Sequence, residues 1–118
     1  MHVRKYRAVE AEALAALYRE SVLGLGPQAY TPEQVAAWAA YPEDLDEFRL
    51  RLARGLTLVA EVDSRVAGFG QLDPVDRVSF LYTSSAFARR GVATAIYGRL
   101  EAHAIGHGAR QLRTEASR

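Results

Sequence analysis

The segment from Leu81 to Ala95 holds the residue types that could do chemistry. It reads Leu-Tyr-Thr-Ser-Ser-Ala-Phe-Ala-Arg-Arg-Gly-Val-Ala-Thr-Ala, which is an apolar strand, a polar elbow, two arginines, a glycine and small residues that open a helix. Free backbone N–H groups and the helix dipole create positive potential at such a junction. Gly91 allows the backbone to approach an oxygen atom closely, and Arg89 and Arg90 add charge. The pattern predicts a phosphate site that would suit a pyrophosphate.

The elements that must position this segment follow from the hydrophobic pattern. Thr31 and Pro32 occupy the N-cap and first positions of one predicted helix. The order predicts an α+β fold, a three-layer α/β sandwich with a mixed central sheet, whose last β-helix-β crossover is right-handed and parallel. The predicted elements are a strand at 2–7, helices at 11–23, from Thr31 and at about 43–53, strands at 56–62, 66–72 and 78–83, a helix at 92–107 and a strand at 111–115.

Composition bounds the possible functions. A length of 118 residues predicts a single domain, residues 1–118, and the absence of cysteine excludes disulfides, thiolate metal sites and a cysteine nucleophile. A net charge of +1 argues against nucleic-acid binding through Arg89, Arg90 and Arg99. No secretory signal or bilayer-spanning apolar run is visible, so no membrane partner and a cytoplasmic location are expected.

The elbow resembles a motif of the GCN5-related N-acetyltransferase (GNAT) family. Ala88-Arg-Arg-Gly-Val-Ala93 is similar to the family's Gln/Arg-x-x-Gly-x-Gly/Ala, with alanine at the first position. The stretch from Tyr30 to Trp38 also resembles the second helix of many small bacterial members. The resemblance implies an acetyl-CoA cosubstrate whose pantetheine amides pair with the acyl-site strand. The implied cofactor-binding residues are Leu81, Tyr82 and Thr83 for the pantetheine and Arg89, Arg90, Gly91, Val92, Ala93 and Thr94 for the pyrophosphate.

Direct attack by a primary amine of a small molecule or peptide is the implied reaction. It needs no metal and no covalent enzyme intermediate. A backbone N–H of Tyr82 or Thr83 is expected to hold the developing oxyanion. Glu61 and Glu115 are candidates for relaying the proton of the amine to water, and the Tyr82 side chain could face either the thioester or the core.

The end of the chain departs from the family pattern. After the strand that ends at Glu115 the family continues into a fourth helix and two more strands, which are absent from this sequence. The C-terminally truncated fold would expose the edge of its last strand, so a homodimer that covers this strand is expected. The alternative function is a catalytically impaired CoA-binding or interaction module that has lost its catalytic segment.

Two further patterns favour structural interpretations, and a third stays open. Gly24-x-Gly26 and Gly68-x-Gly70 lack the third glycine and the strand-to-helix setting of a dinucleotide site. His103 and His107 are four residues apart on a predicted helix, but no third ligand completes a metal site. The aromatic residues Tyr30, Trp38 and Tyr41 could belong to the core or to the wall of an acceptor pocket.

Overall fold

The computed structural model describes residues 1–25, 30–41, 44–74, 76–87 and 89–114. The elements are β1 (His2–Lys5), η1 (Ala8–Glu10), α1 (Ala11–Leu25), α2 (Pro32–Ala39), α3 (Leu45–Leu52), β2 (Leu56–Val62), β3 (Arg65–Leu72), β4 (Arg77–Thr83), η4 (Ser85–Phe87), α4 (Val92–Gly106) and β5 (Arg113–Thr114). Every predicted element is present, although β1 and β5 are shorter than the pattern suggested. Within these residues no helix is both long enough and apolar enough to cross a bilayer.

The five strands form one sheet in the order β1-β2-β3-β4-β5. Neighbouring strands from β1 to β4 are antiparallel, and β5 is parallel to β4. A parallel neighbour requires a crossover connection, which α4 supplies. The predicted mixed sheet and the parallel β4-α4-β5 unit are therefore confirmed.

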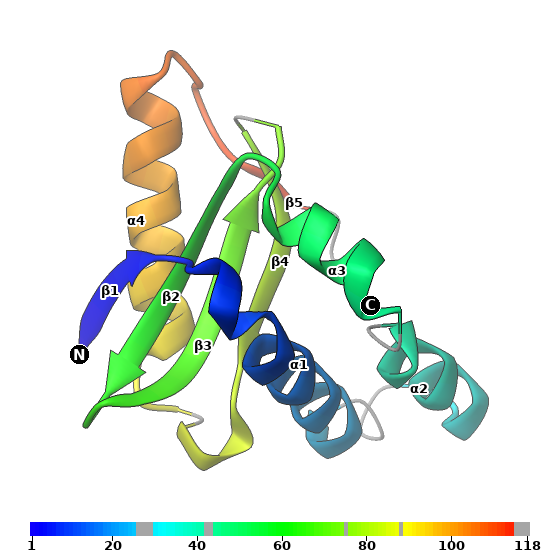
Figure 1. Ribbon diagram of the computed structural model, residues 1–118. Helices are drawn as coiled ribbons and strands as arrows, with labels where there is room; N and C mark the ends of the chain where they lie inside the picture. The colour runs from blue at the N-terminus through cyan, green and yellow to red at the C-terminus, as the bar shows by residue number, and fades with distance from the viewer. Residues whose placement is uncertain (26–29, 42–43, 75, 88, 115–118) are drawn as a thin grey trace.

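Helices cover both faces of the sheet, as Figure 1 shows: α4 lies against one face, and α1 and α3 lie on the other. Each face has its own apolar core. The core between the sheet and α1 to α3 contains aromatic and aliphatic side chains such as Leu14, Phe48 and Phe69. The core between the sheet and α4 contains residues such as Ile96 and Leu100. All five of these side chains are fully buried. This is the three-layer α+β arrangement that the sequence predicted.

Two glycines of β3 allow α4 to pack close to the sheet. A Cβ atom on Gly68 would lie 2.8 Å from Val92 Cγ1, and one on Gly70 would lie 2.7 Å from Ile96 Cγ2. Because real Cβ atoms do not approach other atoms so closely, side chains here would push α4 away from β3. The Gly68-x-Gly70 pair therefore serves helix packing, as its structural interpretation required.

Side-chain hydrogen bonds cap the N-termini of α2 and α3. Thr31 Oγ1 accepts a hydrogen bond from the Gln34 N–H at 3.2 Å, and the Gln34 side chain accepts one from the Thr31 N–H at 2.9 Å. This reciprocal capping satisfies donors that the first helical turn leaves open. Asp44 caps α3 in a similar way by accepting from the Glu47 N–H at 3.1 Å. Capping therefore starts both helices where the sequence predicted or close to it.

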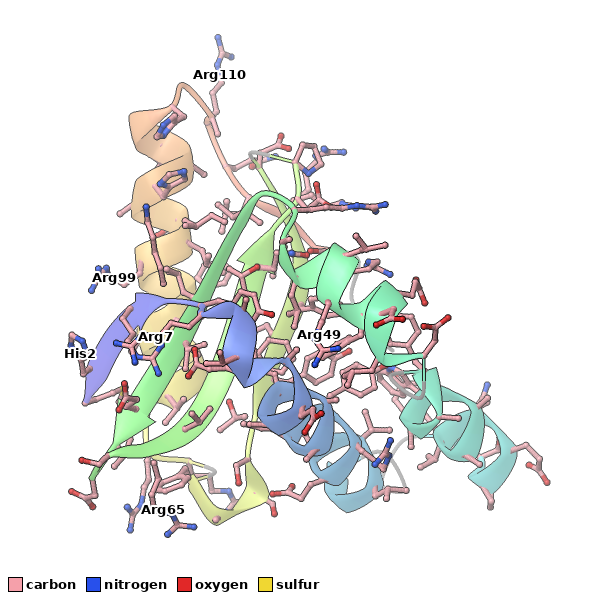
Figure 2. All side chains as sticks on the ribbon, in the orientation of Figure 1. His2, Arg7, Arg49, Arg65, Arg99 and Arg110 are labelled. Carbon is pink, nitrogen blue, oxygen red and sulfur yellow. The ribbon has the colours of Figure 1, made fainter. Side chains whose placement is uncertain are left out.

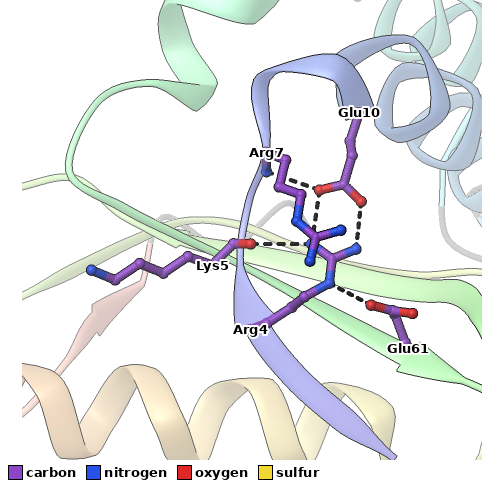
Figure 3. Close-up of polar contacts among 5 residues, drawn as sticks. All are labelled: Arg4, Lys5, Arg7, Glu10 and Glu61. Carbon is purple, nitrogen blue, oxygen red and sulfur yellow. Dashed lines mark hydrogen bonds and ion pairs between the residues drawn. The ribbon is translucent and has the colours of Figure 1, made fainter.

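An arginine with two carboxylate partners ties the first strand to the rest of the fold (Figure 3). Arg4 on β1 binds Glu10 through two hydrogen bonds, of 2.9 and 2.6 Å, and also donates to Glu61 on β2. The Arg4 and Glu10 side chains are each only 12% exposed, so this ion pair is largely shielded from water. Hydrogen bonds from Arg4 hold the pKa values of both carboxyl groups below their usual range. The network should stabilise the β1–β2 pairing wherever both carboxylates are ionised.

We expect Arg4→Met to lower the melting temperature at pH 7 by roughly 5 °C or more, because it leaves two carboxylates without their cation. The carboxyl pKa values are depressed in the folded state, so this stability is fully present above the ordinary carboxyl pKa and is lost as pH falls through the lowered values. Thermal unfolding of both proteins between pH 7 and pH 3 checks this. Arg19→Met, at an exposed position of α1, is the matched control. A difference that stays constant across this range would contradict the prediction.

Candidate functional site

Strand β4 has one paired edge and one mostly open edge. Its inner edge pairs with β3 from Val78 to Thr83, whereas β5 meets it only at Arg77 and Val78. Among the residues described, no strand covers the outer edge of β4 between Phe80 and Thr83. This stretch, called here the open edge, is the side of the sheet where a ligand could add to the ladder.

One hydrogen bond fixes the register at the end of β4. The Ser84 N–H donates to the Ala67 oxygen at 2.8 Å. In an antiparallel ladder this bond makes the paired residues Thr83 and Gly68 a non-hydrogen-bonded pair. Backbone groups of Thr83 therefore do not point toward β3.

Alternation along the strand extends this result to its neighbours. The backbone N–H and C=O groups of Phe80 and Tyr82 point toward β3, and those of Leu81 and Thr83 point outward at the open edge. The outward-facing residues lie about 7 Å apart along the strand. Of the two N–H groups that the sequence offered for the oxyanion, the one of Thr83 has the required direction and the one of Tyr82 does not.

A carboxylate from α1 holds the elbow that follows β4. Glu20 accepts hydrogen bonds from Ser84 Oγ at 2.8 Å and from the Ser85 N–H at 3.2 Å. Ser84 Oγ in turn accepts from the Ala86 N–H at 3.3 Å, which closes the first turn of η4. Phe87 at the end of η4 is buried beneath α4. The elbow is thus fixed at both ends before the arginines begin.

The N-terminus of α4 is open toward solvent. Gly91 is the N-cap, with φ of 77°, so the N-cap residue has no side chain with which to cap the first turn. The first backbone bond of the helix runs from the Ala95 N–H to Gly91 O at 2.9 Å, so the N–H groups of residues 92–94 have no acceptor within the helix. An added Cβ at Gly91 would meet no atom within 4 Å. Exposed Arg89, with φ of 63°, and exposed Arg90 flank this end.

Arg65 is a third cation at the elbow, which the sequence reasoning missed. Its guanidinium carbon lies 5.2 Å from the centre of the Phe87 ring, and that of Arg90 lies 5.7 Å from the same ring. Figure 2 shows Arg65 at the end of the sheet where the elbow lies. The register pairs Gly68 with Thr83, so the first residue of β3 falls beside the residues that follow β4. That register, rather than any local motif, is the signal that could have identified Arg65.

The Tyr82 side chain packs on the α1 face of the sheet. Its ring centroid lies 4.7 Å from that of Tyr18 and 5.7 Å from that of Phe69. Burial raises the pKa of Tyr18 far above its usual value, and the neighbouring Tyr82 adds to this effect. The Tyr18 phenol should therefore stay protonated at neutral pH.

Of the two acidic candidates, the structure describes only Glu61, and it does not bring Glu61 to the open edge. Glu61 lies on β2, separated from β4 by β3, and its carboxylate is bound by Arg4 (Figure 3). A carboxyl group with a lowered pKa is also a weaker base. Its proposed proton relay stays a prediction that this placement does not support. Glu115 lies outside the described residues, as does Ala88 at the start of the arginine-glycine motif.

The structure also describes the aromatic residues and the histidine pair that the sequence analysis singled out. Tyr30 and Trp38 contact each other edge to face, with centroids 5.2 Å apart, and both remain partly exposed. His103 and His107 stack at 4.2 Å on α4, and within the described ranges no group of three or more potential metal ligands occurs. Tyr41 packs against Tyr18 on the sheet face that α4 does not cover. Tyr30, Trp38 and Tyr41 are therefore partly buried residues that pack against the core on the α1 face of the sheet.

Comparison with known proteins gives a family match over most of the chain. The model of the acetyltransferase (GNAT) family matches residues 15–117. The chain belongs to this family. The predicted resemblance is therefore confirmed, and so is the GNAT-like fold.

Two individual relatives place the chain within the family. A crystal structure from Rhodopseudomonas palustris, named GCN5-related N-acetyltransferase: Aminotransferase, Class-II, is 33% identical with a TM-score of 0.96 over 98% of this chain and 72% of that one. YafP of Escherichia coli (strain K12), described as an uncharacterized N-acetyltransferase, is 27% identical over 97 residues. The match covers 81% of this chain and 62% of YafP, so the chain spans less than two thirds of that relative.

A more distant structure shows the same fold with a ligand. The PaiA N-acetyltransferase from Thermoplasma acidophilum, solved in complex with coenzyme A, is 19% identical. Its TM-score is 0.77 over 91% of this chain and 73% of that chain. At this identity the comparison establishes the fold.

A testable consequence concerns the elbow itself. Glu20→Ala removes the acceptor of the Ser84 Oγ–H and Ser85 N–H bonds, so the Ser85 amide should exchange its hydrogen about five-fold faster. Hydrogen exchange measured by NMR checks this. Glu12→Ala, an exposed acid on the same helix, should leave the Ser85 amide unchanged. Equal exchange in all three proteins would show that Glu20 does not hold the elbow.

Proposed function

We propose that this protein is an N-acetyltransferase that moves an acetyl group from acetyl-CoA to a primary amine of a small molecule or peptide. The observation that carries the proposal is the continuous run from the open edge of β4, through the elbow, to the open N-terminus of α4. Membership of the acetyltransferase family and the coenzyme A complex of a protein with the same fold support this function.

The cofactor would use backbone groups along this run. The two amides of its pantetheine arm would pair with the outward-facing groups of Leu81 and Thr83 as an added strand does. Its pyrophosphate would accept hydrogen bonds from the N–H groups of residues 92–94, with Gly91 giving room for close approach. Arg65, Arg89 and Arg90 would supply positive charge around the phosphates.

The reaction would then be a direct displacement. The neutral amine attacks the thioester carbonyl, the carbonyl oxygen takes up negative charge, and the thiolate of coenzyme A leaves. Of the two N–H groups expected to hold that oxygen, the one of Thr83 points outward at the open edge and the one of Tyr82 does not. Holding both reactants against one rigid strand supplies orientation without a covalent intermediate.

Arg90→Glu and Gly91→Asp test the phosphate site. Each puts negative charge where the pyrophosphate would bind, so the dissociation constant for coenzyme A should rise at least about ten-fold. The melting temperature should change little for Arg90→Glu, because Arg90 is exposed, and slightly more for Gly91→Asp, because φ of 77° disfavours side chains. Calorimetry and thermal unfolding provide the two measurements.

Arg99→Glu is the matched control, since Arg99 is exposed on α4 two turns beyond the site. It should keep the affinity of the unchanged protein. Equal affinities in all variants would remove the phosphate assignment. A thiol-release assay with a panel of amines then separates the enzyme from a CoA-binding module, which would bind coenzyme A without turnover.

A homodimer that covers β5 and a cytoplasmic location are the remaining parts of this proposal. Among the described residues β5 pairs with β4 alone, so its other edge is available for a second chain. Analytical ultracentrifugation tests the dimer.

A further inference from the structure

Arg51 is a cation in an aromatic setting without a carboxylate partner among the described residues. Its guanidinium carbon lies 5.1 Å from the centre of the Phe80 ring and 5.6 Å from that of Tyr41. Its Nη1 donates to the Tyr41 hydroxyl at 3.1 Å, whereas its Nε is buried and bonds to none of the described residues. A guanidinium has five N–H donors, so most of its hydrogen-bonding capacity is unused by these contacts.

Two other arginines of the chain provide a comparison. Arg4, whose side chain is 12% exposed, has two carboxylate partners. Arg49, two residues before Arg51 on α3, is 45% exposed and lies near Asp46 and Glu12 at 3.6 and 3.9 Å. Charged groups withdrawn from water are normally paired, because desolvation without an anion is costly. Arg51 therefore has the features of a cation that awaits an anionic ligand.

The position of Arg51 relates it to the open edge. Phe80, on which it packs, directly precedes Leu81, the first outward-facing residue of that edge. The Phe80 ring lies 6.1 Å from that of Tyr82, so a row of rings follows β4 from Arg51 toward Thr83. These rings belong to the α1 to α3 face of the sheet, and α4 with its N-terminus lies on the opposite face (Figure 1).

The cofactor and the acceptor would approach the open edge from opposite faces of the sheet. A cofactor whose pyrophosphate sits at the start of α4 reaches the open edge from the α4 face, which leaves the other face for the acceptor. An acceptor lying there would place its amine at the edge near Leu81 and Thr83 and its other end toward Arg51. A carboxylate matches the planar fork of a guanidinium with two parallel hydrogen bonds. Low water content beside the rings would strengthen that pair.

We propose that the acceptor is an amino carboxylate, such as a free amino acid, and that Arg51 binds its carboxylate while the amine is acetylated. This inference rests on the proposed acetyl transfer and adds the substrate class. Arg51 is a specificity residue in this scheme and takes no part in bond making.

The kinetic test compares acceptors that differ only in charge. Pairs such as 4-aminobutyrate and 4-aminobutyramide, or phenylalanine and its amide, are assayed with the unchanged protein and with Arg51→Met. We expect kcat/KM for the carboxylates to fall roughly 10- to 100-fold in Arg51→Met, and that for the carboxamides to change less than about three-fold. Taking the ratio between variants cancels the intrinsic reactivity difference between acid and amide.

Two further variants sharpen the comparison. Arg51→Lys keeps the charge but loses the fork, so it should restore only part of the preference. Arg49→Met changes the exposed arginine of the same helix and should leave the ratio unchanged. An acid-to-amide ratio that is the same in the unchanged protein and in Arg51→Met, with coenzyme A affinity intact, overturns the proposal.

A binding measurement keeps the test independent of turnover. The Arg51 Nε–H resonance is followed by NMR while the amino carboxylate is added, with and without coenzyme A. The proposal requires this resonance to shift when the carboxylate is added and to stay in place when the carboxamide is added. If the carboxylate causes no shift, the proposal is overturned, even in a protein that acetylates other amines. If coenzyme A does not bind, acetyl transfer itself fails, and the same titration still decides the Arg51 site. The same resonance is also compared between the unchanged protein and Glu115→Gln, both without ligand. A difference would show that Glu115 of this chain is the partner of Arg51, and this result also overturns the proposal.

Discussion

The structure depends on a strand that is hydrogen-bonded along one edge and mostly open along the other. Backbone N–H and C=O groups must find partners in protein, ligand or water, and β3 satisfies only the half of β4 that faces it. β5 meets β4 at its first two residues, so the outward-facing groups of Leu81 and Thr83 depend on something other than the described sheet. A sheet edge with a buried face on each side is rigid, and this rigidity makes the edge useful as a template for an extended ligand.

The neighbouring elements turn that edge into a directed site. Close packing of α4 on Gly68 and Gly70 sets the height of the helix above the sheet, and the elbow fixed by Glu20 sets where the helix begins. The donors at the α4 N-terminus consequently lie at the end of the open edge. Backbone groups dominate this site, so its geometry depends on the fold more than on any single side chain. The family therefore could be recognised although Ala88 replaces a residue of the usual motif.

The sequence predicted what local patterns encode. Capping at Thr31, the meander and the amphipathic α4 each depend on residues a few positions apart, and all were found. The missed features join distant segments: 57 residues separate Arg4 from Glu61, and 64 separate Glu20 from Ser84. Neither periodicity nor a motif reports such contacts. The direction of the Tyr82 backbone likewise required the strand register, since a shift of one residue reverses it.

Two partly buried arginines differ in how the fold satisfies them. Arg4 is saturated by Glu10 and Glu61, which lowers the pKa values of both carboxyl groups and holds β1 against β2. Among the described residues, Arg51 contacts a phenol oxygen and two aromatic rings. Cation–π contacts offset part of the desolvation cost, but they are not hydrogen bonds to the guanidinium donors. The donors that Arg51 does not use on the described residues are the ones that the proposed acceptor carboxylate would engage, whereas the donors of Arg4 are already taken by carboxylates of the fold.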